Sequence, residues 1–532
     1  MLKIVNSLAN NINLIEKNLT LQNFSKVERY AGKLIKKGVN DLWLLNVLAI
    51  SLAKQNKFLR ASKCFHSILA LDPEGYNSHF NLARLFHDKG DDEKVIEFCS
   101  KSLKMHPDHL GSINLLVIIN LKKGNLSKSL IEKQLNIAKK ILIKDPINKL
   151  ALKCISHSLA ELGDYKAALN TLNKLEQNYG YNPKLYNDLG TCLIELGRYS
   201  EARDKLFLSE TNLGKYNLGM LDFKEGNYKD GWLGYEFGLK ENIRKIKNLS
   251  KKFDVLPQWK IEKTAGPLLI IGEQGLGDEI MFSTMFPEII KKVNSIYLIT
   301  DKRLHGLFSR TYPEINIIKD QDLFDIKKLN FRIAMGSLGK FFRQTREDFF
   351  YSEKRLLKPL NSSINALKSK YNFDKKKLYI GLSWHTTNLS HGSRRNIKLA
   401  EIVKAFKELN VSFINLQYGD HTHEIKQASN KFKKEIFLSE EGDNKSDIDI
   451  LAAKISLCDY VVSIDNSTAH LAGSLGVNTL LILPEVSDWR WQVRGKDSLW
   501  YNSIRLFRNN SKFNWNETLE ELKNYILNSN LD

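Results

Sequence analysis

The sequence predicts an α-helical solenoid of short repeats, followed by an α/β region of two doubly wound lobes with parallel sheets. Three observations predict this fold class. Proline and glycine punctuation recurs at a fixed interval over residues 1–240, as it does in repeat arrays. From residue 267 onward, short β-rich apolar runs alternate with segments of helical spacing, which is typical of parallel sheets. Polar side chains gather where the predicted strands end, and sheets of this kind bind ligands there.

Length and charge limit the classes of protein that the chain can belong to. The chain has 532 residues, of which 42% are hydrophobic and 10% aromatic, so several domains with ordinary cores are expected. A formal charge of +20 makes nucleic acid, a membrane surface or an anionic substrate worth considering as a partner. The lysines are spread along the chain rather than clustered on a motif, which favours a lysine-rich composition. No nucleic-acid partner is therefore expected.

The cysteines and the apolar runs predict the compartment. The cysteines stand singly and without C-x-x-C spacing, which indicates buried thiols in a reducing compartment; they are Cys64, Cys99, Cys154, Cys192 and Cys458. The first residues lack the apolar core and cleavage site of a secretory signal. The longest apolar run, "INLLVIINL" at 113–121, is about half as long as a bilayer span requires. We expect a cytoplasmic protein without a transmembrane segment.

Residues 1–240 form the predicted solenoid. Pro73 and Pro107 close helices with "LDP" and "MHP", and each follows the same frame of small residues and a turn residue. That frame recurs in six copies, with a partial copy at 23–34. Its period of about 34 residues and its residue types resemble the tetratricopeptide repeat. Small residues there let the paired helices approach, glycine makes the turn, and proline stops the second helix.

The repeats predict a surface for protein partners. Each helix pair buries its apolar stripe only by stacking on the next pair, and the stack forms a concave groove. By analogy with this fold, we expect protein–protein contacts through the groove that recruit a partner or an acceptor. A spacer or a dimerisation arm is the structural alternative.

The α/β region is predicted as two lobes after a basic linker at 241–266. The N-terminal lobe covers 267–365 and the C-terminal lobe covers 375–532. The predicted strands are 267–272, 295–300, 315–319 and 332–335 in the first lobe, and 378–384, 411–418, 459–465 and 478–484 in the second. Two such lobes face one another across a cleft, with ligands beyond the carboxyl ends of the strands.

The stretch "GEQGLGDEIMF" at 272–282 follows the first of these strands. Gly272 and Gly277 have the spacing of the two glycines of a phosphate-binding loop, but Asp278 and Glu279 occupy the positions of its lysine and hydroxyl residue. Two carboxylates would repel a polyphosphate. The loop is therefore either a tight turn or a site for something other than phosphate.

Two segments of the second lobe have features of an anion site. In "VVSIDNSTAHLAGSLG" a helix is expected from about Ser467, and the hydroxyls and N–H groups of Ser467 and Thr468 suit a diphosphate. The alternative for this segment is an ordinary helix cap by Asp465 or Asn466. The alternative for His470 is a histidine that is packed in the core with its hydrogen bonds satisfied. The segment "GLSWHTTNLSHGSRRNIKL" holds a pair of arginines at 394–395, which binds phosphate in some loops and is solvated in others.

Three segments in this order resemble a known family. They are "GEQGLGDEIMFSTMFPEI", "IGLSWHTTN…SRRNIKL" and "DYVVSIDNSTAHLAGSLGVNTLLILP…SDWRW". Together with "SDWRWQVRGKDSLWYNSIRLFR" at 487–508, they look like bacterial proteins that join tetratricopeptide repeats to a glycosyltransferase domain similar to the heptosyltransferases of family 9. The architecture is also similar to that of the protein O-linked N-acetylglucosamine transferases. The resemblance covers essentially the whole chain. It implies the GT-B fold of two Rossmann-like lobes, with the acceptor on the N-terminal lobe and the nucleotide sugar on the C-terminal lobe.

The resemblance also implies roles for individual residues. Asp278 matches the aspartate of the family's Gly-Asp motif, which is proposed to take the proton of the acceptor hydroxyl. The expected substrate-binding residues are Gly275, Gly277, Ser383, Arg394, Arg395, Gln417, Asp465, Ser467, Thr468, His470, Trp489 and Arg490. Trp489 and Arg490 close the donor pocket or, alternatively, pack between the lobes. Asn396 stands where the repeat-linked proteins have serine, which leaves open which of Arg394 and Arg395 faces the diphosphate.

These expectations combine into a function. The sequence predicts an inverting glycosyltransferase that moves a sugar from a nucleotide-sugar donor to a hydroxyl of a protein or glycan acceptor recruited by the repeats. No metal ligand and no cofactor are expected, and the nucleotide sugar is a substrate. The alternative is a non-catalytic repeat scaffold that binds protein partners and carries a degenerate transferase domain.

Overall fold

The computed structural model describes residues 2–39, 41–241, 243–244, 246, 249–262, 266–351, 356–387, 394–438, 443–509 and 514–529, except for the side chains of 2–9 and 351. The chain divides into two compact units, Met1–Asn178 and Tyr179–Asp532. The first unit is helical, and the second contains further helices followed by two parallel sheets. This order confirms the predicted fold class of a helical repeat array followed by an α/β region.

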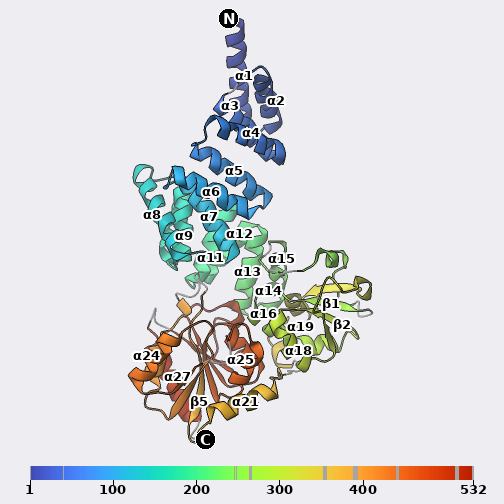
Figure 1. Cartoon of the computed structure of the whole chain (residues 1–532), viewed down its shortest axis with the longest axis vertical. Helices are drawn as coiled ribbons and strands as arrows, with labels where there is room; N and C mark the ends of the chain where they lie inside the picture. Colours follow the sequence, from blue (N-terminus) through green and yellow to red (C-terminus); the bar gives the residue numbers. More distant parts are fainter. Residues whose placement is uncertain are drawn as a thin grey trace. The chain divides into compact units, whose positions relative to one another are not determined.

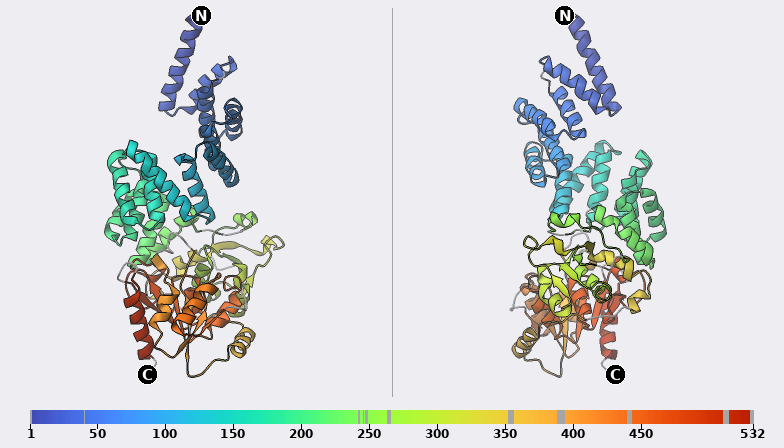
Figure 2. Two further views of the ribbon diagram at one scale, coloured as in Figure 1. Left: turned by 60° about the vertical axis from the view of Figure 1, so that its left-hand side comes forward. Right: turned by 90° about the vertical axis from the view of Figure 1, so that its right-hand side faces the viewer.

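The first unit is built from helices that follow one another in antiparallel pairs, coloured from blue to cyan in Figure 1 and seen from two further sides in Figure 2. From α1 to α9, each helix packs on the next one along the chain, so the apolar faces form continuous cores. The helices are α1 (Leu2–Thr20), α2 (Phe24–Lys36), α3 (Leu42–Lys54), α4 (Phe58–Leu71), α5 (Tyr76–Lys89), α6 (Asp92–Met105), α7 (Leu110–Lys123), α8 (Lys128–Lys144), α9 (Lys149–Glu161) and α10 (Tyr165–Tyr179).

The predicted punctuation ends these helices. Pro73, Pro107 and Pro146 each follow closely on the last residue of α4, α6 and α8. Gly90 and Gly124 end α5 and α7 with φ angles of +80° and +72°, which glycine adopts without the strain of a side chain. Turn and stop residues of the repeat pattern therefore do in the structure what the sequence predicts.

The second unit begins with two more helix pairs. They are α11 (Pro183–Glu195), α12 (Tyr199–Ser209), α13 (Asn212–Glu225) and α14 (Tyr228–Tyr235), and the short α15 (Phe237–Lys240) follows. The backbones of α13 and α14 approach so closely that a Cβ on Gly219 would lie 2.7 Å from the Cα of Gly234. Among the described residues, the helices from α3 to α14 form six pairs, and α2 covers the segment of the predicted partial copy.

The N-terminal lobe contains a four-stranded parallel sheet in the order β3-β2-β1-β4. Its strands are β1 (Leu268–Ile271), β2 (Ile296–Ile299), β3 (Ile315–Ile317) and β4 (Phe331–Ala334). Around them lie α16 (Leu276–Ser283), α17 (Phe286–Ile290), α18 (His305–Thr311), α19 (Gly339–Phe342) and α20 (Asp348–Tyr351), with the 3₁₀ turns η1 (Lys251–Val255), η2 (Lys302–Leu304), η3 (Ile326–Lys328) and η4 (Met335–Leu338). The four predicted strands of this lobe are thus confirmed.

The C-terminal lobe contains a six-stranded parallel sheet in the order β10-β9-β8-β5-β6-β7. Its strands are β5 (Leu378–Ser383), β6 (Val411–Asn415), β7 (Ile436–Phe437), β8 (Tyr460–Ile464), β9 (Thr479–Leu483) and β10 (Ile504–Arg508). Its helices are α21 (Asn361–Tyr371), α23 (Leu399–Ala405), α24 (Thr422–Phe432), α25 (Ile448–Ile455), α26 (Ser467–Ser474) and α27 (Asn516–Ser529), with the turn η5 (Trp489–Trp491). Figure 1 shows α24 and α27 on one face of this sheet and α25 on the other.

Burial of the central strands fits a parallel sheet covered on both faces. Every residue of β6, β8 and β9 is buried, as expected where helices lie on both sides. One core contains residues of both lobes together with Phe223, Trp232 and Tyr235 of α13 and α14. The last repeat pair is therefore part of the core of the α/β region.

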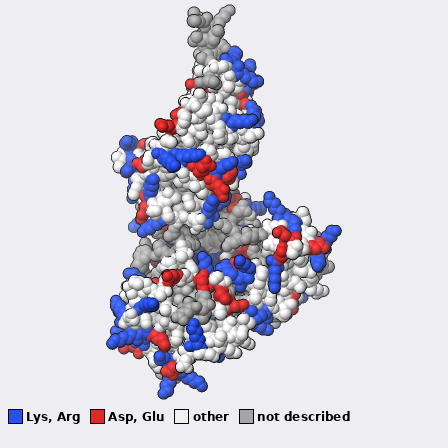
Figure 3. All heavy atoms as spheres, in the orientation of Figure 1, with Lys and Arg blue, Asp and Glu red and all other residues white. Residues whose placement is uncertain are grey.

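Charged side chains are mixed on the face drawn in Figure 3, where lysines and arginines are interspersed with acidic and uncharged residues. No helix of the described residues combines the length and apolar character needed to cross a membrane.

Candidate functional site

The candidate site lies at the carboxyl ends of strands from both sheets. In the C-terminal sheet, β5 and β8 are neighbours at the point where the strand order reverses, which is where such sheets form a ligand crevice. β8 leads through Asp465 into α26, and the segment that carries Arg394 and Arg395 follows β5. In the N-terminal sheet, β1 leads into α16, whose first turn carries Asp278.

The first turns of α16 and α26 are in contact. A Cβ placed on Gly277 would lie 2.9 Å from Cδ2 of His470 and 3.3 Å from the Cα of Ser467. Only a residue without a side chain fits this approach. Gly277 thus brings the predicted catalytic helix of one lobe against the predicted donor helix of the other.

Asp278 is fixed by hydrogen bonds from both lobes. Its Oδ2 accepts from the N–H of Gly275 at 3.2 Å, which caps α16. Its Oδ1 accepts from Nε of Arg490 at 3.0 Å and also from Nη2 of the same guanidinium. A carboxylate in the first turn of a helix is favoured by the helix dipole. Asp278 is therefore held as an ordered carboxylate that faces the C-terminal lobe.

A chain of alternating charges runs from Asp278 into the C-terminal lobe. Nη1 of Arg490 donates to Oδ1 of Asp488 at 2.6 Å, and Arg395 lies 3.8 Å from Asp488 and 3.0 Å from Oδ2 of Asp465. Burial by itself would raise the pKa of Asp488, but Arg490 and Arg395 hold that pKa well below its usual range. Burial by itself would lower the pKa of Arg490. The charges of Asp278 and Asp488 outweigh burial, so the pKa of Arg490 is raised. Asp488 and Arg490 are therefore both charged at neutral pH.

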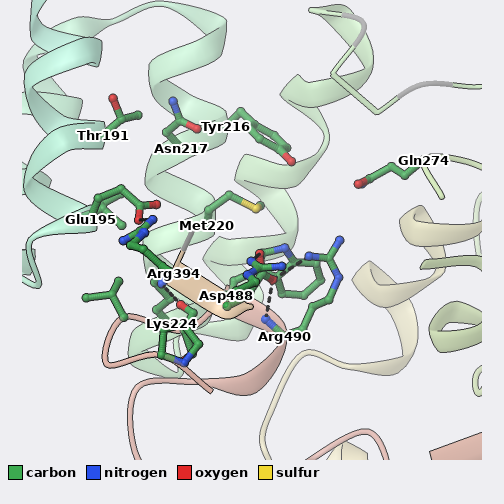
Figure 4. A pocket seen from close by; sticks show the side chains of 16 residues that line it. Thr191, Glu195, Tyr216, Asn217, Met220, Lys224, Gln274, Arg394, Asp488 and Arg490 are labelled. Atoms are coloured by element: carbon green, nitrogen blue, oxygen red, sulfur yellow. Dashed lines mark hydrogen bonds and ion pairs between the residues drawn. The ribbon is translucent and has the colours of Figure 1, made fainter. Parts of the chain in front are cut away.

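A pocket of about 260 Å³ opens beside this chain of charges (Figure 4). Side chains of α11 and α13 form one side of it, and the segment 484–490 with the two arginines of 394–395 forms the other. The lining residues are Thr191, Ile194, Glu195, Tyr216, Asn217, Met220, Lys224, Gln274, Arg394, Arg395, Pro484, Val486, Ser487, Asp488, Trp489 and Arg490. Of the predicted site residues, the pocket brings together the two arginines of 394–395, Trp489 and Arg490.

Both arginines of the uncertain pair border the pocket, with different partners. Arg394 forms an ion pair with Glu195 of α11, and the two lie side by side in Figure 4. Arg395 pairs with Asp465 at the end of β8. The guanidinium groups of Arg394 and Arg395 are both part of the pocket wall, so an anion in the pocket would lie near both of them.

The N-terminus of α26 is capped by its own chain. Oδ1 of Asn466 accepts from the N–H groups of Thr468 at 3.0 Å and Ala469 at 3.4 Å. Thr468 is buried and Ser467 is half-buried, and neither lines the pocket. In this state, two of the N–H groups that a diphosphate would use are bonded to Asn466.

Ser383 and Gln417 belong to a buried network behind the cap. Oε1 of Gln417 accepts from the backbone N–H groups of Trp384 and His385 at 3.0 and 2.9 Å, and from Oγ of Ser383 at 3.3 Å. Ser383 in turn accepts from Nδ2 of Asn466 at 2.8 Å. The network fixes the chain after β5 relative to the start of α26, so these two residues position the site without lining the pocket.

His470 has the environment of a neutral, packed histidine. Its Nδ1 lies 3.0 Å from the hydroxyl of Tyr501, and its ring stacks on Trp491 with centroids 5.0 Å apart. Burial, followed by the charge of Arg490, lowers the pKa of His470 to about 4. His470 is therefore uncharged at neutral pH, and its ring forms the surface of α26 against which Gly277 of α16 packs.

Trp489 packs between the last repeat and the C-terminal lobe. Its ring stacks on Phe223 of α13 at 4.7 Å between centroids, and the guanidinium of Arg490 lies 4.8 Å from its centroid. Part of the residue also borders the pocket. Trp489 thus packs against the repeat helices, and the choice between pocket closure and packing between the lobes stays a prediction.

Sequence reasoning missed Glu195, Lys224 and Asp488. Each lies in the pocket wall, and Lys224 is buried, with its Nζ donating to the carbonyl of Ser487. The available signal is a helical face: Tyr216, Met220 and Lys224 follow one another at four-residue intervals on α13 and thus share one side of it.

A second pocket, of about 350 Å³, lies in the N-terminal lobe beside Glu279. Among the described residues, no group of three or more His, Cys, Asp and Glu side chains is arranged to hold a metal ion.

Comparison with known proteins shows which kind of repeat the chain contains. Models of the tetratricopeptide repeat match residues 46–109 and 159–206, so the chain contains tetratricopeptide repeats. The solved structures similar to it include a tetratricopeptide repeat protein from Parabacteroides merdae, with 16% identity, a TM-score of 0.34 and coverage of 44% of this chain and 93% of that one. A glycosyl transferase of family 9 from Veillonella parvula has 10% identity, a TM-score of 0.34 and coverage of 50% and 89%.

One relative extends over nearly the whole sequence. Protein FlbA of Caulobacter vibrioides is 24% identical over 531 residues, which cover 94% of this chain and 86% of FlbA. The BBSome complex member bbs-4 of Caenorhabditis elegans is 28% identical over 145 residues, which cover 26% of this chain and 30% of that protein.

Proposed function

We propose that the chain is a glycosyltransferase that moves a sugar from a nucleotide-sugar donor to a hydroxyl group of a protein or glycan acceptor. One observation carries the proposal: the carboxylate of Asp278 on the N-terminal lobe meets Arg490 of the C-terminal lobe at the carboxyl ends of the sheets. This arrangement combines a proton acceptor with cations in one interlobe site. Asp278 and Arg490 come from the first and the third of the sequence segments that resemble family 9 glycosyltransferases.

The proposed reaction is a single displacement. The acceptor hydroxyl attacks the anomeric carbon from the face opposite the leaving group, and its proton passes to Asp278 as the new carbon–oxygen bond forms. The bond from the anomeric carbon to the diphosphate breaks, and the nucleoside diphosphate leaves with the electron pair. Arg395 and Arg490 offset its developing negative charge. Because guanidinium groups supply this charge, neither a metal ion nor a cofactor is part of the proposal.

A donor screen tests the proposal. Titration calorimetry of the full chain with UDP-, GDP-, ADP- and dTDP-sugars, with and without Mg²⁺, should show binding of at least one donor. If none of them binds, the enzyme proposal fails and the repeat scaffold remains as the function.

The substitution Asp278→Asn tests the role of the carboxylate. An asparagine keeps the shape and an acceptor oxygen for Arg490 but cannot take a proton at neutral pH. We expect transfer to fall by on the order of 10²–10⁴-fold, with donor affinity within a few-fold of the original. Asp230→Asn, at an exposed carboxylate of α14, is the control. A variant that loses donor binding along with transfer would place Asp278 on the donor side instead.

A further inference from the structure

The pocket beside Asp488 has a side that the transferase lobes do not supply. Thr191, Ile194 and Glu195 reach it from α11, and Tyr216, Met220 and Lys224 reach it from one face of α13. All of these helices belong to the same compact unit as the two lobes. The end of the repeat array thus contributes side chains directly to the candidate donor pocket.

The charges that line this pocket are unequal. Its cations are Lys224, Arg394, Arg395 and Arg490, and its carboxylates are Glu195 and Asp488. Asp488 is already shared by Arg395 and Arg490, and Glu195 pairs with Arg394. Cations therefore outnumber carboxylates in the wall, and the excess favours a ligand that carries negative charge.

Lys224 is the unusual member of this group. The residue is 8% exposed, and its ammonium donates to the carbonyl of Ser487. Burial lowers its pKa, while Glu195 and Asp488 act in the opposite direction. Burying an ammonium group is costly unless nearby groups compensate for the lost water. An ammonium has three N–H donors, so its carbonyl partner leaves donors available to a ligand in the pocket.

The position of Lys224 is rigidly tied to the C-terminal lobe. Its neighbour Phe223 is 1% exposed and stacks on Trp489, and its own bond to Ser487 lies one residue from Asp488. A charge placed so is pre-organised for an anion in the pocket and needs no rearrangement on binding.

We propose that the last repeat helices form one side of the donor site, with Lys224 of α13 binding the donor diphosphate directly and Glu195 of α11 competing with it for Arg394. The inference rests on the proposed function, because it assigns the anion in the pocket to a nucleoside diphosphate. Without ligand, Glu195 holds Arg394; with the diphosphate bound, Arg394 exchanges this carboxylate for a phosphate oxygen.

Two substitutions with opposite expected effects test the inference in the full chain. Lys224→Met removes the charge but keeps a long side chain that suits the buried position. It should weaken the binding of UDP, GDP, ADP or dTDP, and of inorganic pyrophosphate, by about tenfold or more, as for a lost hydrogen bond to a charged group. Glu195→Gln should tighten the same binding several-fold, because it removes a repelling carboxylate and releases Arg394.

The matched control is Lys215→Met, which removes the same charge from an exposed position of α13 and should leave the affinities as they are. Titration calorimetry measures all four proteins. A general weakening of the fold would lower affinity in every variant, so tighter binding by Glu195→Gln separates a direct role from damage. Unchanged affinity in Lys224→Met, or weaker binding in Glu195→Gln, overturns the inference.

The probes separate this inference from the proposed function. If nucleotide sugars bind and react but Lys224→Met and Glu195→Gln behave like the original protein, the inference fails and the glycosyltransferase stands. If pyrophosphate binds with the expected dependence on both residues but no nucleotide sugar binds, the diphosphate site stands and the glycosyltransferase fails. If the original protein binds neither probe, both fail.

Discussion

Glu279 follows Asp278 in the sequence but has a different environment. Its side chain is buried in the N-terminal lobe, where Oε2 accepts from the hydroxyl of Thr300 and from the N–H of Asp301 at 3.0 Å. Burial raises the pKa of Glu279 from 4.5 to about 7. The folded protein thus keeps this proton at pH values where the unfolded chain has lost it. The resulting stability is fully present below pH 4.5 and is lost as the pH rises through 7.

The substitution Glu279→Gln should therefore stabilise the protein at alkaline pH. Glutamine keeps an oxygen for both hydrogen bonds and carries no charge to bury. We expect the free energy of unfolding at pH 8 to rise by at most about 3 kcal/mol, with the difference shrinking toward pH 4. Scanning calorimetry of both proteins across this range measures it. Parallel pH profiles for the two proteins would show that Glu279 ionises normally.

A site residue could be predicted where a short stretch of sequence around it was informative by itself. Asp278, Arg395 and Arg490, which the structure connects through Asp488, could be named from the sequence because each lies in a short segment at the end of a strand or after it. Their roles in binding and catalysis stay predictions. Glu195 and Lys224 were missed because a charged residue on a repeat helix looks solvated until the tertiary contact that buries it is known. The roles of Ser467 and Thr468 in binding stay a prediction, since Asn466 now occupies the N–H groups of Thr468 and Ala469.

At the scale of elements, α26 depends on Asn466 for its start. The side chain caps two N–H groups and also donates to Ser383 at 2.8 Å, so it joins α26 to the end of β5. We expect Asn466→Ala to lower the free energy of unfolding by about 1–2 kcal/mol. Asn466→Ser should cost less, because a hydroxyl still caps the helix. Urea unfolding compares them, and equal losses in both variants would rule out the cap as the cause.

Most elements were predictable from periodicity, and the exceptions have a physical reason. The eight predicted strands all occur, since buried parallel strands form continuous apolar runs. The strands β7 and β10 were missed at the edges of the C-terminal sheet. β7 has only two residues, and Arg505 and Arg508 interrupt the apolar residues of β10, so neither forms a long apolar run. The segment 278–293, which has helical spacing in the sequence, contains residues of two helices, α16 and α17, rather than one.

At the scale of the whole molecule, the last repeat pair is built into the two α/β lobes. Nε and Nη2 of Arg244, just after the repeats, donate to the buried carboxylate of Glu273 at 2.9 and 2.6 Å, and Tyr235 donates to it at 2.9 Å. Nε1 of Trp232 donates to the carbonyl of Arg343 at 2.7 Å. The period of the sequence shows where the repeats end but not which of them are buried against the lobes, because burial depends on residues far away in the chain.

This arrangement predicts which fragment folds alone. The fragment 179–532 keeps α11 to α15 and should unfold in one cooperative transition, with the pyrophosphate affinity of the full chain.

The fragment 249–532 loses Phe223, Trp232, Tyr235 and Arg244, which exposes part of the core and leaves the carboxylate of Glu273 buried without its cation. Removing one partner of a buried ion pair costs about 3–5 kcal/mol, and the exposed apolar surface adds to this cost. We expect the shorter fragment to aggregate or to melt well below the longer one in scanning calorimetry and gel filtration. If it instead stayed monomeric with the same melting temperature, the repeats would be a separate attachment, and the last helix pairs would have no structural part in the α/β region.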